Sequence, residues 1–354
     1  MNYKSVLNFN TLFYLSCILF YVSCNYLADQ RANLKVLPSE IRTNTHLYTH
    51  TSYYAKEDIT IHKSAVLTIE SGVKLTMCDT CKIYCEGSIL AQGRETKPIE
   101  IGDRGKETKM YFNTSKLSSK FNNTYFNNTS IYLSNISFSL DSCFFNEYDF
   151  NEKSNEISFV ISANNSNVHI INSFFTGNNL KEGIGFNRGT CTIVNNKFYK
   201  HPDAIELSNI DSALVSKNQI EYSNDDGIDL NNCKNILITN NSIRYSKDKG
   251  LSIGNRQVLS QPNCIKIDSN LISNNKIGIA VKNNSLVEVS NCILVNNEIG
   301  LFFSEESQNE APYVSIVDST FFKNNKLLSN SNENPRLRFS NCFSEQWIPG
   351  DSNL

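Results

Sequence analysis

The chain has 354 residues, of which 40% are apolar and 19% charged, and its formal net charge is −2. Proteins that bind nucleic acid carry a basic surface, so a chain with a pI near 6.2 is not expected to bind nucleic acid. The five histidines are scattered, and none belongs to a Ser-His or Cys-His nucleophile signature. Composition therefore argues against a nucleic-acid partner and against Ser-His chemistry.

Residues 1–24 predict an export signal. Lys4 is the only charged residue before an apolar run from Thr11 to Cys24, which is too short to span a membrane comfortably. The junction at Cys24 resembles that of a bacterial lipoprotein, although Tyr21 stands where leucine is usual, and it also suits an ordinary signal peptidase. We therefore expect an exported protein, extracellular or on the cell surface. A lipid anchor at Cys24, a plain cleaved end and an uncleaved anchor all stay open.

Residues 25–58 are mixed and polar, and they predict a lead-in with an N-terminal cap. Regular β repeats are expected over residues 59–343. Within that range, residues 103–130 are rich in Lys, Asn, Ser and Thr, which predicts an irregular coil or a surface loop. The chain thus divides into a signal, a cap, one long repeat region and a short tail.

Three of the eleven cysteines form one tight cluster, at Cys78, Cys81 and Cys85. Three thiols without a fourth nearby ligand make an incomplete zinc site, so we expect core packing or a local disulfide there. Three other cysteines directly follow Ser or Asn at one repeated slot and are interpreted as small stacking residues, not bridges: Cys143, Cys292 and Cys342.

One short phrase, Asn-x-Φ with Φ apolar, recurs at steps of 21 to 29 residues. Its copies begin at Asn172, Asn196, Asn218, Asn241, Asn270, Asn291, Ser319 and Asn341. Each copy lies in a short alternating run, as in residues 236–243, and such alternation predicts a strand. A second phrase, Gly-Φ-x-Φ, follows each first one, as in residues 227–230. Two or three short strands in a period in the low twenties predict one coil of a parallel β-helix.

The recurring asparagines support this interpretation, because asparagine is otherwise poor in strands. Stacked coils lie about 4.8 Å apart, so their amides can form a hydrogen-bonded ladder at a turn. Asparagine and glycine also tolerate the left-handed backbone that tight turns require. The apolar members of each phrase are expected to point inward and stack. The fold predicted is all-β, a right-handed parallel β-helix of about ten coils.

The two phrases, recurring in phase over roughly residues 60–343, resemble the right-handed parallel β-helix repeats of the pectate-lyase-like superfamily. Residues 225–254 also resemble β-helix segments associated with spore-coat-kinase-type surface proteins. The second resemblance implies a surface β-helix and no kinase, because the chain has no Gly-rich phosphate loop or kinase signature.

Aligning the coils on the second phrase produces two acidic columns. The column just before the strand contains Glu182, Asp203, Asp226 and Lys249, and the column facing outward within it contains Glu206, Asp229 and Ser252. Carboxylates about 4.8 Å apart repel by about 3.5 kcal/mol at a dielectric near 20. They are therefore expected to recruit a cation, to pair with Lys249 or to raise a pKa.

Oxygen-rich clusters suit Ca²⁺, and the predicted calcium ligands are Asp203, Glu206, Asp226 and Asp229. Asp203 and Asp226 are 23 residues apart, as are Glu206 and Asp229, so each pair would stack across neighbouring coils. The alternative is a solvated acidic face that binds nothing.

The superfamily resemblance implies acidic residues on an exposed strand face that bind calcium or cleave uronic-acid polymers, although the detailed motifs of those families are absent. Asp226 and Asp229 are candidate catalytic residues, because carboxylates at this spacing approach the retaining-glycosidase distance. A lyase would also need a basic residue, for which Lys249 and Arg188 are candidates.

Tyr222 and Tyr245 share one position of the repeat. Stacked tyrosines in β-helices favour the core, and the alternative is a platform for sugar rings. With Glu182 and Arg188 they form the candidate ligand-binding set.

Two long steps in the repeat mark insertions at residues 255–264 and 304–311, both after the second phrase. Insertions on one side of a repeat protein build a binding face or are merely tolerated loops. The tail, residues 344–354, predicts a short cap in which Trp347 and Ile348 cover the last coil, because an open solenoid end invites pairing with other chains.

The leading functional interpretation is an exported surface protein that binds carbohydrate or mediates adhesion, with a polysaccharide or surface glycan as partner. The alternatives are a calcium-dependent polysaccharide lyase or glycoside hydrolase and a purely structural surface module. The fold alone does not choose among them. Whether the protein is an enzyme stays open, and the sequence leans against it.

Overall fold

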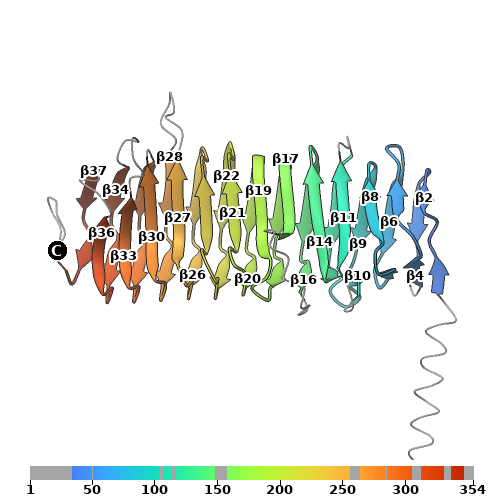
Figure 1. The fold of residues 1–354 in the computed structure, drawn as a ribbon, viewed down its shortest axis with the longest axis horizontal. Helices are drawn as coiled ribbons and strands as arrows, with labels where there is room; N and C mark the ends of the chain where they lie inside the picture. Colours follow the sequence, from blue (N-terminus) through green and yellow to red (C-terminus); the bar gives the residue numbers. More distant parts are fainter. Residues whose placement is uncertain are drawn as a thin grey trace, which may run out of the picture.

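The computed structural model describes residues 34–49, 51–103, 107–113, 117–147, 158–255, 264–283, 285–304, 312–330 and 336–346. Over these ranges the chain is a right-handed parallel β-helix, and its regular elements are strands stacked in one long row (Figure 1). No helix in these ranges is long and apolar enough to cross a membrane. The signal predicted at residues 1–24 and the capping residues Trp347 and Ile348 lie outside the described residues.

Each coil has three sides, and we number them in chain order from the Gly-Φ-x-Φ strand. Side 1 contains β2 (Glu40–Ile41), β5 (Ile59–Ile61), β8 (Lys82–Cys85), β11 (Thr108–Asn113), β14 (Thr129–Ser134), the start of β17 (Phe159–Ile171), the start of β19 (Glu182–Val194), β21 (Ile205–Ser208), β24 (Ile228–Asn231), β27 (Lys249–Asn255), β30 (Ile277–Asn283), β33 (Ile299–Ser304) and β36 (Lys326–Asn330).

Side 2 contains β3 (Thr45–Leu47), β6 (Val66–Glu70), β9 (Ser88–Gln92), β12 (Ser119–Asn122), β15 (Ser137–Asp141), the ends of β17 and β19, β22 (Ser212–Ser216), β25 (Ile236–Thr239), β28 (Cys264–Asp268), β31 (Leu286–Ser290), β34 (Tyr313–Val317) and β37 (Arg336–Ser340). Sides 1 and 2 belong to one 24-stranded sheet, which is continuous because β17 and β19 each run along both sides.

Side 3 is a 14-stranded sheet that takes one strand from every coil. Its strands are β1 (Leu34–Val36), β4 (Ser52–Ala55), β7 (Lys74–Met77), β10 (Ile99–Gly102), β13 (Thr124–Asn127), β16 (Phe144–Asn146), β18 (Phe174–Thr176), β20 (Lys197–Tyr199), β23 (Gln219–Glu221), β26 (Ser242–Arg244), β29 (Leu271–Ser273), β32 (Ile293–Val295), β35 (Thr320–Phe322) and β38 (Phe343–Ser344). Fourteen strands make a longer solenoid than the ten coils predicted.

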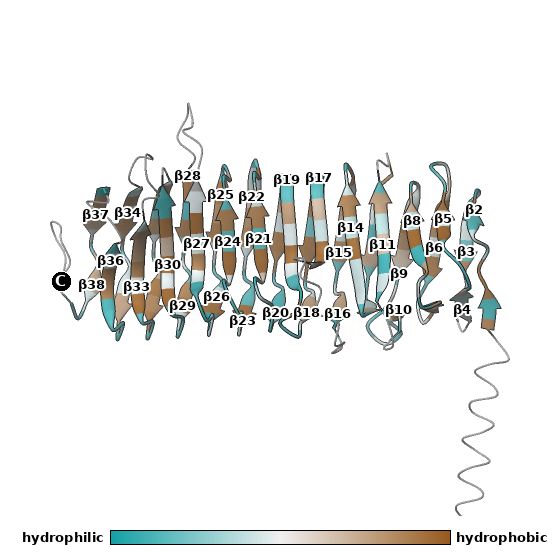
Figure 2. Cartoon of the chain, viewed as in Figure 1, coloured by the Kyte–Doolittle hydropathy of each residue, from teal (hydrophilic) through white to brown (hydrophobic). Residues whose placement is uncertain are grey.

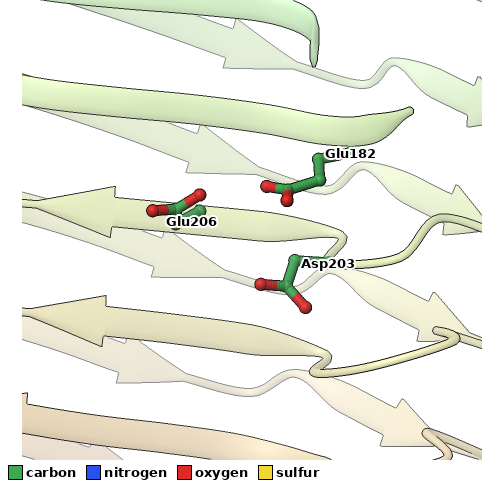
Figure 3. Close-up of side chains that lie close together, drawn as sticks. All are labelled: Glu182, Asp203 and Glu206. Carbon is green, nitrogen blue, oxygen red and sulfur yellow. The ribbon is translucent and has the colours of Figure 1, made fainter. Parts of the chain in front are cut away.

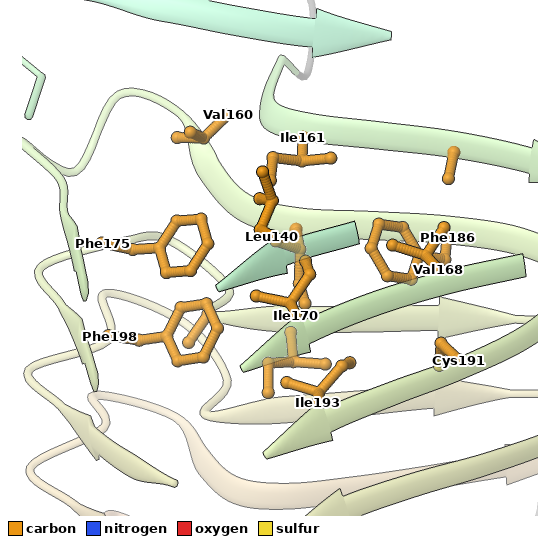
Figure 4. Packing of buried hydrophobic residues seen from close by; sticks show 14 of the residues in the cluster. Leu140, Val160, Ile161, Val168, Ile170, Phe175, Phe186, Cys191, Ile193 and Phe198 are labelled. Carbon is orange, nitrogen blue, oxygen red and sulfur yellow. The ribbon is translucent and has the colours of Figure 1, made fainter. Parts of the chain in front are cut away.

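The core is a set of parallel columns along the solenoid axis. Hydrophobic and polar residues alternate along the strands (Figure 2), so every second side chain points inward. One column consists of stacked phenylalanine rings, in which Phe175 lies 4.7 Å from both Phe145 and Phe198. Figure 4 shows the rings of Phe175 and Phe198 beside isoleucines from sides 1 and 2. Each coil therefore buries its apolar residues mainly against the coils before and after it.

The predicted asparagine ladder is present, buried between sides 2 and 3. Asn218 N donates to Asn241 Oδ1 at 2.9 Å, and Asn218 Nδ2 donates to Asn241 Oδ1 and to Ile193 O. Asn196 and Asn270 continue the ladder in the coils on either side.

The phase of three copies of the phrase was wrong by one residue. The buried column runs through Ser173, Asn196, Asn218, Asn241, Asn270, Cys292 and Ser319. Asn172, Asn291 and Asn341 instead occupy the preceding position, where the backbone has positive φ. Asparagine suits the buried position because of its amide, and it suits the preceding position because it tolerates left-handed backbone. The sequence pattern alone therefore did not distinguish the two positions.

The strand ladder is also more extensive than predicted. Strands β1 to β4 lie within the expected lead-in at residues 25–58 and pair in parallel, so coils begin by Leu34 and not at residue 59. Residues 103–130 contain β11, β12 and β13, which continue the ladder. Their Lys, Asn and Ser residues alternate with buried apolar residues such as Met110 and Phe121. That alternation was overlooked.

The cysteines behave as small core residues with one local bridge. Cys78 and Cys81 form a disulfide, with their Cα atoms 5.2 Å apart. Cys85, Cys143, Cys292 and Cys342 are buried and lie outside this disulfide. The interpretation of Cys143, Cys292 and Cys342 as stacking residues is confirmed.

Candidate functional site

The corner between sides 3 and 1 is tight, and glycine makes it possible. A Cβ on Gly183 would lie 2.4 Å from Ala204 O, and one on Gly227 would lie 2.6 Å from Gly250 O. A Cβ at either glycine would push against the backbone of the next coil, although Ala204 occupies the equivalent position in the coil between them. The residue preceding each of these positions is therefore held close to the neighbouring coil, and this is the position of the first acidic column.

Two carboxylates of the first acidic column join neighbouring coils. Asp203 Oδ1 accepts a hydrogen bond from Asp226 N at 2.8 Å, and Asp226 Oδ1 accepts one from Lys249 N at 2.9 Å. Asp226 is buried. These contacts give Asp203 and Asp226 a role in holding the corner, whatever else they bind.

Glu182, in the coil before Asp203, has no such role. Its side chain is 9% exposed, and among the described residues its Oε2 atom has no hydrogen-bond partner. Glu182, Asp203 and Glu206 each offer a carboxylate oxygen, and these atoms lie within 4.8 Å of one another. Figure 3 shows the three side chains converging from β19, the turn before β21, and β21. We call these three residues the carboxylate triad.

Burial dominates the electrostatics of this corner. It raises the pKa of Glu182 to about 9, with further contributions from the carboxylates of Glu206 and Asp203. Burial also raises the pKa of Asp203 to about 8, although the hydrogen bond from the Asp226 amide opposes it. In the absence of a cation, Glu182 and Asp203 are therefore held mostly as neutral acids at pH 7.

A lysine compensates the other end of the column. Lys249 Nζ lies 3.2 Å from Asp226 Oδ1 and also contacts Asp248. Burial raises the pKa of Asp226 to only about 6, because Lys249 opposes the shift. Two of the three responses expected of the acidic columns, pairing with Lys249 and a raised pKa, thus occur at opposite ends of one column.

Three of the four predicted calcium ligands belong to two carboxylate groups. Asp203 and Glu206 belong to the carboxylate triad, and Asp203 and Asp226 form a second group with exposed Asp225. Asp229 belongs to neither group, and its Oδ2 accepts a hydrogen bond from Asn231 at 2.6 Å. Sequence reasoning placed Glu182 in one column with Asp203 and assigned it to ligand binding. It missed that Glu182 also approaches Glu206, because that contact depends on how the corner bends.

The outward column of side 1 carries a feature that sequence reasoning missed. Tyr84, Tyr111 and Tyr132 are in register on β8, β11 and β14. Their rings stack, with centroids 5.4 and 4.8 Å apart. The same column continues through Ser162 and Gly185 to Glu206 and Asp229. The alternation of apolar and polar residues in 82–85, 108–113 and 129–134 could have predicted this stack of tyrosines.

We call this outward column, from Tyr84 to Asp229, the tyrosine–carboxylate strip. Its tyrosines and carboxylates are half-buried, so each is partly accessible to solvent. Ser252, expected to face outward in the next coil, is fully buried. The strip therefore ends at Asp229.

The remaining predicted ligand-binding residues are not gathered with the carboxylate triad. Tyr222 and Tyr245 stack at 4.8 Å and are 44% and 39% exposed, so the expectation that they lie in the core was wrong. They precede the acidic corner and have positive φ, uncommon for a bulky residue. Arg188 is exposed at the turn between sides 1 and 2, six residues along extended β19 from Glu182. The structure gives no contact between Arg188 and the acidic columns.

A half-buried lysine, Lys181, lies between the tyrosines and the triad. Lys181 Nζ lies 2.8 Å from Glu107 Oε1, 3.0 Å from Ser130 Oγ and 3.4 Å from Glu147 Oε1. Glu107 also pairs with Lys109. The partners are up to 74 residues apart in the chain, so no local motif could have predicted this network.

The insertions predicted at residues 255–264 and 304–311 lie outside the described residues except for Asn255, Cys264 and Ser304. Each falls between a side 1 strand and the side 2 strand of the same coil, β27 and β28 or β33 and β34. The two insertions therefore occupy equivalent places in the repeat.

Comparisons with known proteins support the fold. Residues 182–344 match a family described as "right handed beta helix region". The periplasmic alginate epimerase AlgG is 12% identical, with 86% of this chain and 77% of that chain covered and a TM-score of 0.51. At this identity the similarity establishes the fold alone. No curated protein sequence matches the chain.

Two further solved structures are similar to a lesser degree. A tailspike protein of E. coli bacteriophage HK620, solved with a pentasaccharide, is 12% identical, with 96% and 62% of the two chains covered and a TM-score of 0.47. The Streptococcus pneumoniae surface protein and adhesin PfbA is 12% identical, with 79% and 91% covered and a TM-score of 0.42. These scores are too low to carry an argument about this chain.

Proposed function

We propose that this right-handed β-helix protein is an exported surface protein that binds carbohydrate along the outer face of side 1. One observation carries the proposal: the tyrosine–carboxylate strip places three stacked tyrosines and two carboxylates in a single column across consecutive coils. A repeated column of this kind suits an extended polymer lying along the solenoid axis, because successive polar groups recur about every 4.8 Å.

The chemistry of the strip suits a hydroxyl-rich ligand. Because the rings of Tyr84, Tyr111 and Tyr132 stack on one another, their faces are largely occupied, and the half-buried side chains are only partly accessible to solvent. A phenol both donates and accepts hydrogen bonds, whereas the carboxylates of Glu206 and Asp229 accept them when ionised. Sugar hydroxyls can satisfy all of these groups.

A divalent cation is a second element of the proposal, with calcium the expected ion. The carboxylate triad is an oxygen-rich group, and the unpartnered Oε2 of buried Glu182 gives it an unfilled acceptor site. A bound cation would let Glu182 and Asp203 ionise and would remove their mutual repulsion. Cation and protons therefore compete for the same oxygens.

A polysaccharide-cleaving enzyme is the second candidate function, and one arrangement favours it. Glu182, with a pKa near 9, is an acid held protonated beside Glu206, and pairs of carboxylates in unlike environments can act as general acid and base. Lys249, the candidate lyase base, is engaged by Asp226 and Asp248. The proposal is therefore binding first, with hydrolysis as the alternative to be tested in parallel.

A glycan array with product detection separates these functions. The wild type should bind a subset of glycans without releasing new reducing or unsaturated ends, with calcium and with a chelator. Tyr111→Ala should weaken binding by about tenfold, in the range expected for a central contact residue. Tyr125→Ala is the matched control, because Tyr125 is also an exposed tyrosine but lies on side 3.

Each other outcome of the array has a defined meaning. Release of new reducing or unsaturated sugar ends would show that the protein is an enzyme that cleaves the glycan. If no glycan is bound, the protein is a structural surface module. Equal losses in the Tyr111 and Tyr125 variants would place the ligand elsewhere.

Export is proposed from residues 1–24, whose composition predicts a signal. The fold is shared with an alginate epimerase described as periplasmic, which is in line with export and with a polysaccharide partner. Mass spectrometry of the mature N-terminus tests this directly. An N-terminus at Cys24 or Asn25 is expected, and a diacylglycerol mass on Cys24 would establish lipidation. Retention of Met1 would contradict cleavage.

A further inference from the structure

We propose, on the premise that side 1 binds carbohydrate, that its ligand is an uncharged polysaccharide and not a polyuronate. The proposal rests on which side chains occupy the outer positions of six consecutive coils, from β11 to β24. Two columns of that surface are fixed by strand register, and neither contains a lysine or an arginine.

The first of these columns is the tyrosine–carboxylate strip. From β11 to β24 its members are Tyr111, Tyr132, Ser162, Gly185, Glu206 and Asp229. Phe159 covers the gap left by Gly185, since a Cβ there would lie 2.1 Å from its ring. The column thus changes from aromatic to acidic along the axis, without a basic group.

The second column, two residues further along each strand, is made of neutral polar side chains. Its members are Asn113, Ser134, Asn164, Asn187, Ser208 and Asn231. Asn187 Nδ2 donates to Asn164 Oδ1 at 3.3 Å, and Asn209 Nδ2 donates to Asn187 Oδ1 at 2.9 Å. These amides are ordered by one another before any ligand arrives, which lowers the entropy cost of binding.

Three lysines beside this surface are already paired with carboxylates, whereas Arg188, which directly follows Asn187, is exposed at the turn between sides 1 and 2 and forms no ion pair with the described residues. Lys109 pairs with Glu107 at 3.2 Å, Lys181 with Glu107 and Glu147, and Lys249 with Asp226 and Asp248. Lys82, in β8, lies at the end of the strip farthest from Glu206. Where no cation occupies the carboxylate triad, a polymer carrying a carboxylate on every sugar would therefore meet Glu206 and Asp229 without a basic side chain in either column.

The hydrogen-bonding groups of the two columns also favour an uncharged polysaccharide. Amides, phenols and serine hydroxyls each donate and accept, and sugar hydroxyls do the same, whereas a carboxylate only accepts. A neutral glycan can therefore pair with every group of both columns. The carboxylates of a polyuronate would face the carboxylates of the strip, and both only accept hydrogen bonds. Repulsion between these like charges lowers the affinity for that ligand.

The test is isothermal titration of the full exported chain with neutral hexose oligomers and with oligogalacturonate of matched length. Each titration is run at low salt, once with a chelator and once with millimolar calcium. The expected result is binding of at least one neutral oligomer, with oligogalacturonate weaker by about tenfold or more. The double variant Glu206→Gln, Asp229→Asn should bring the two affinities closer together, because amides have the shape of the carboxylates without their negative charge.

The outcomes separate this inference from the proposed function. Oligogalacturonate bound as tightly as the neutral oligomers, with chelator or with calcium, overturns the inference and leaves carbohydrate binding standing. Failure of every oligomer to bind overturns the proposed function itself. If the double variant unfolds, Glu206→Gln alone serves, and an unchanged ratio of affinities in that folded variant also overturns the inference.

Discussion

Lys249 Nζ lies 3.2 Å from Asp226 Oδ1, and the two residues occupy equivalent positions of adjacent coils. The acidic column of the corner therefore ends in an ion pair on one side. At its other end Glu182 has no cation among the described residues. This asymmetry explains why burial raises the pKa of Asp226 only to about 6, but that of Glu182 to about 9.

Stability should fall as the pH rises, because of Glu182. Its folded pKa of about 9 lies above the ordinary 4.5, so between these values the folded state holds a proton that the unfolded state releases. The stabilisation is complete below pH 4.5 and is lost as the pH rises through 9, by up to about 1.4 kcal/mol per pH unit for one group.

Denaturant unfolding in chelator from pH 5 to 9 measures this effect against a matched variant. Glu182→Gln should show a shallower decline, since the neutral amide replaces the protonated acid. If the wild type and Glu182→Gln have parallel pH profiles, Glu182 is ionised in the folded protein and the electrostatic description of the corner is wrong.

Calcium should raise the melting temperature of the wild type, because an ion that binds only the folded state stabilises it by about 2.7 kcal/mol at a hundred times its dissociation constant. Asp203→Asn should lose most of the rise, since Asp203 belongs to both carboxylate groups. The asparagine keeps an oxygen to accept the Asp226 amide. Asp229→Asn, outside both groups, is the control and should retain the rise. An equal calcium response in both variants would contradict a site at the triad.

Gly183→Ala should destabilise the fold by about 1–3 kcal/mol, the cost of inserting a methyl group where the backbone cannot move freely. The new Cβ would lie 2.4 Å from Ala204 O. Gly254→Ala is the control, because its Cβ would have its nearest contact at 3.5 Å, an ordinary distance. Thermal unfolding compares the two variants. Equal melting temperatures would show that the corner is looser than described.

Asn218→Ala should cost about 1–3 kcal/mol, because it leaves buried backbone groups of neighbouring coils without their partners. Asn218 bonds to Asn241, to Ile193 O and to the amide of Asn196. Asn224→Ala, at an exposed turn position, should change stability by less than about 0.5 kcal/mol. Chemical denaturation provides the comparison, and a neutral Asn218 variant would mean that water replaces the ladder.

The fold was largely predictable because each coil repeats the same requirements. An inward apolar residue, a tight turn and an amide that reaches the next coil recur every twenty or so residues, so the β-helix and its inward columns followed from the sequence. Finer placement did not follow. Asn172 and Asn196 carry the same letter but belong to different columns, because asparagine satisfies both a left-handed turn and a buried ladder.

The site was predictable only where it follows the repeat. The stacking of Asp203 with Asp226 and of Glu206 with Asp229 depends on strand register and was foreseen. The approach of Glu182 to Glu206 depends on the bend of the corner, which has no signature in one sequence. The network around Lys181 joins residues far apart in the chain. The tyrosine stack passes through Tyr111, in the segment at residues 103–130 that was predicted to be irregular.

The most direct measurement is a crystal structure of the protein with the oligosaccharide that binds best on the array. The account predicts that the sugar lies along side 1, across the coils of Tyr111, Tyr132 and Glu206, with its chain parallel to the solenoid axis. A sugar seated instead on side 3, over exposed Tyr125, or at the corner beside Tyr222 would contradict it.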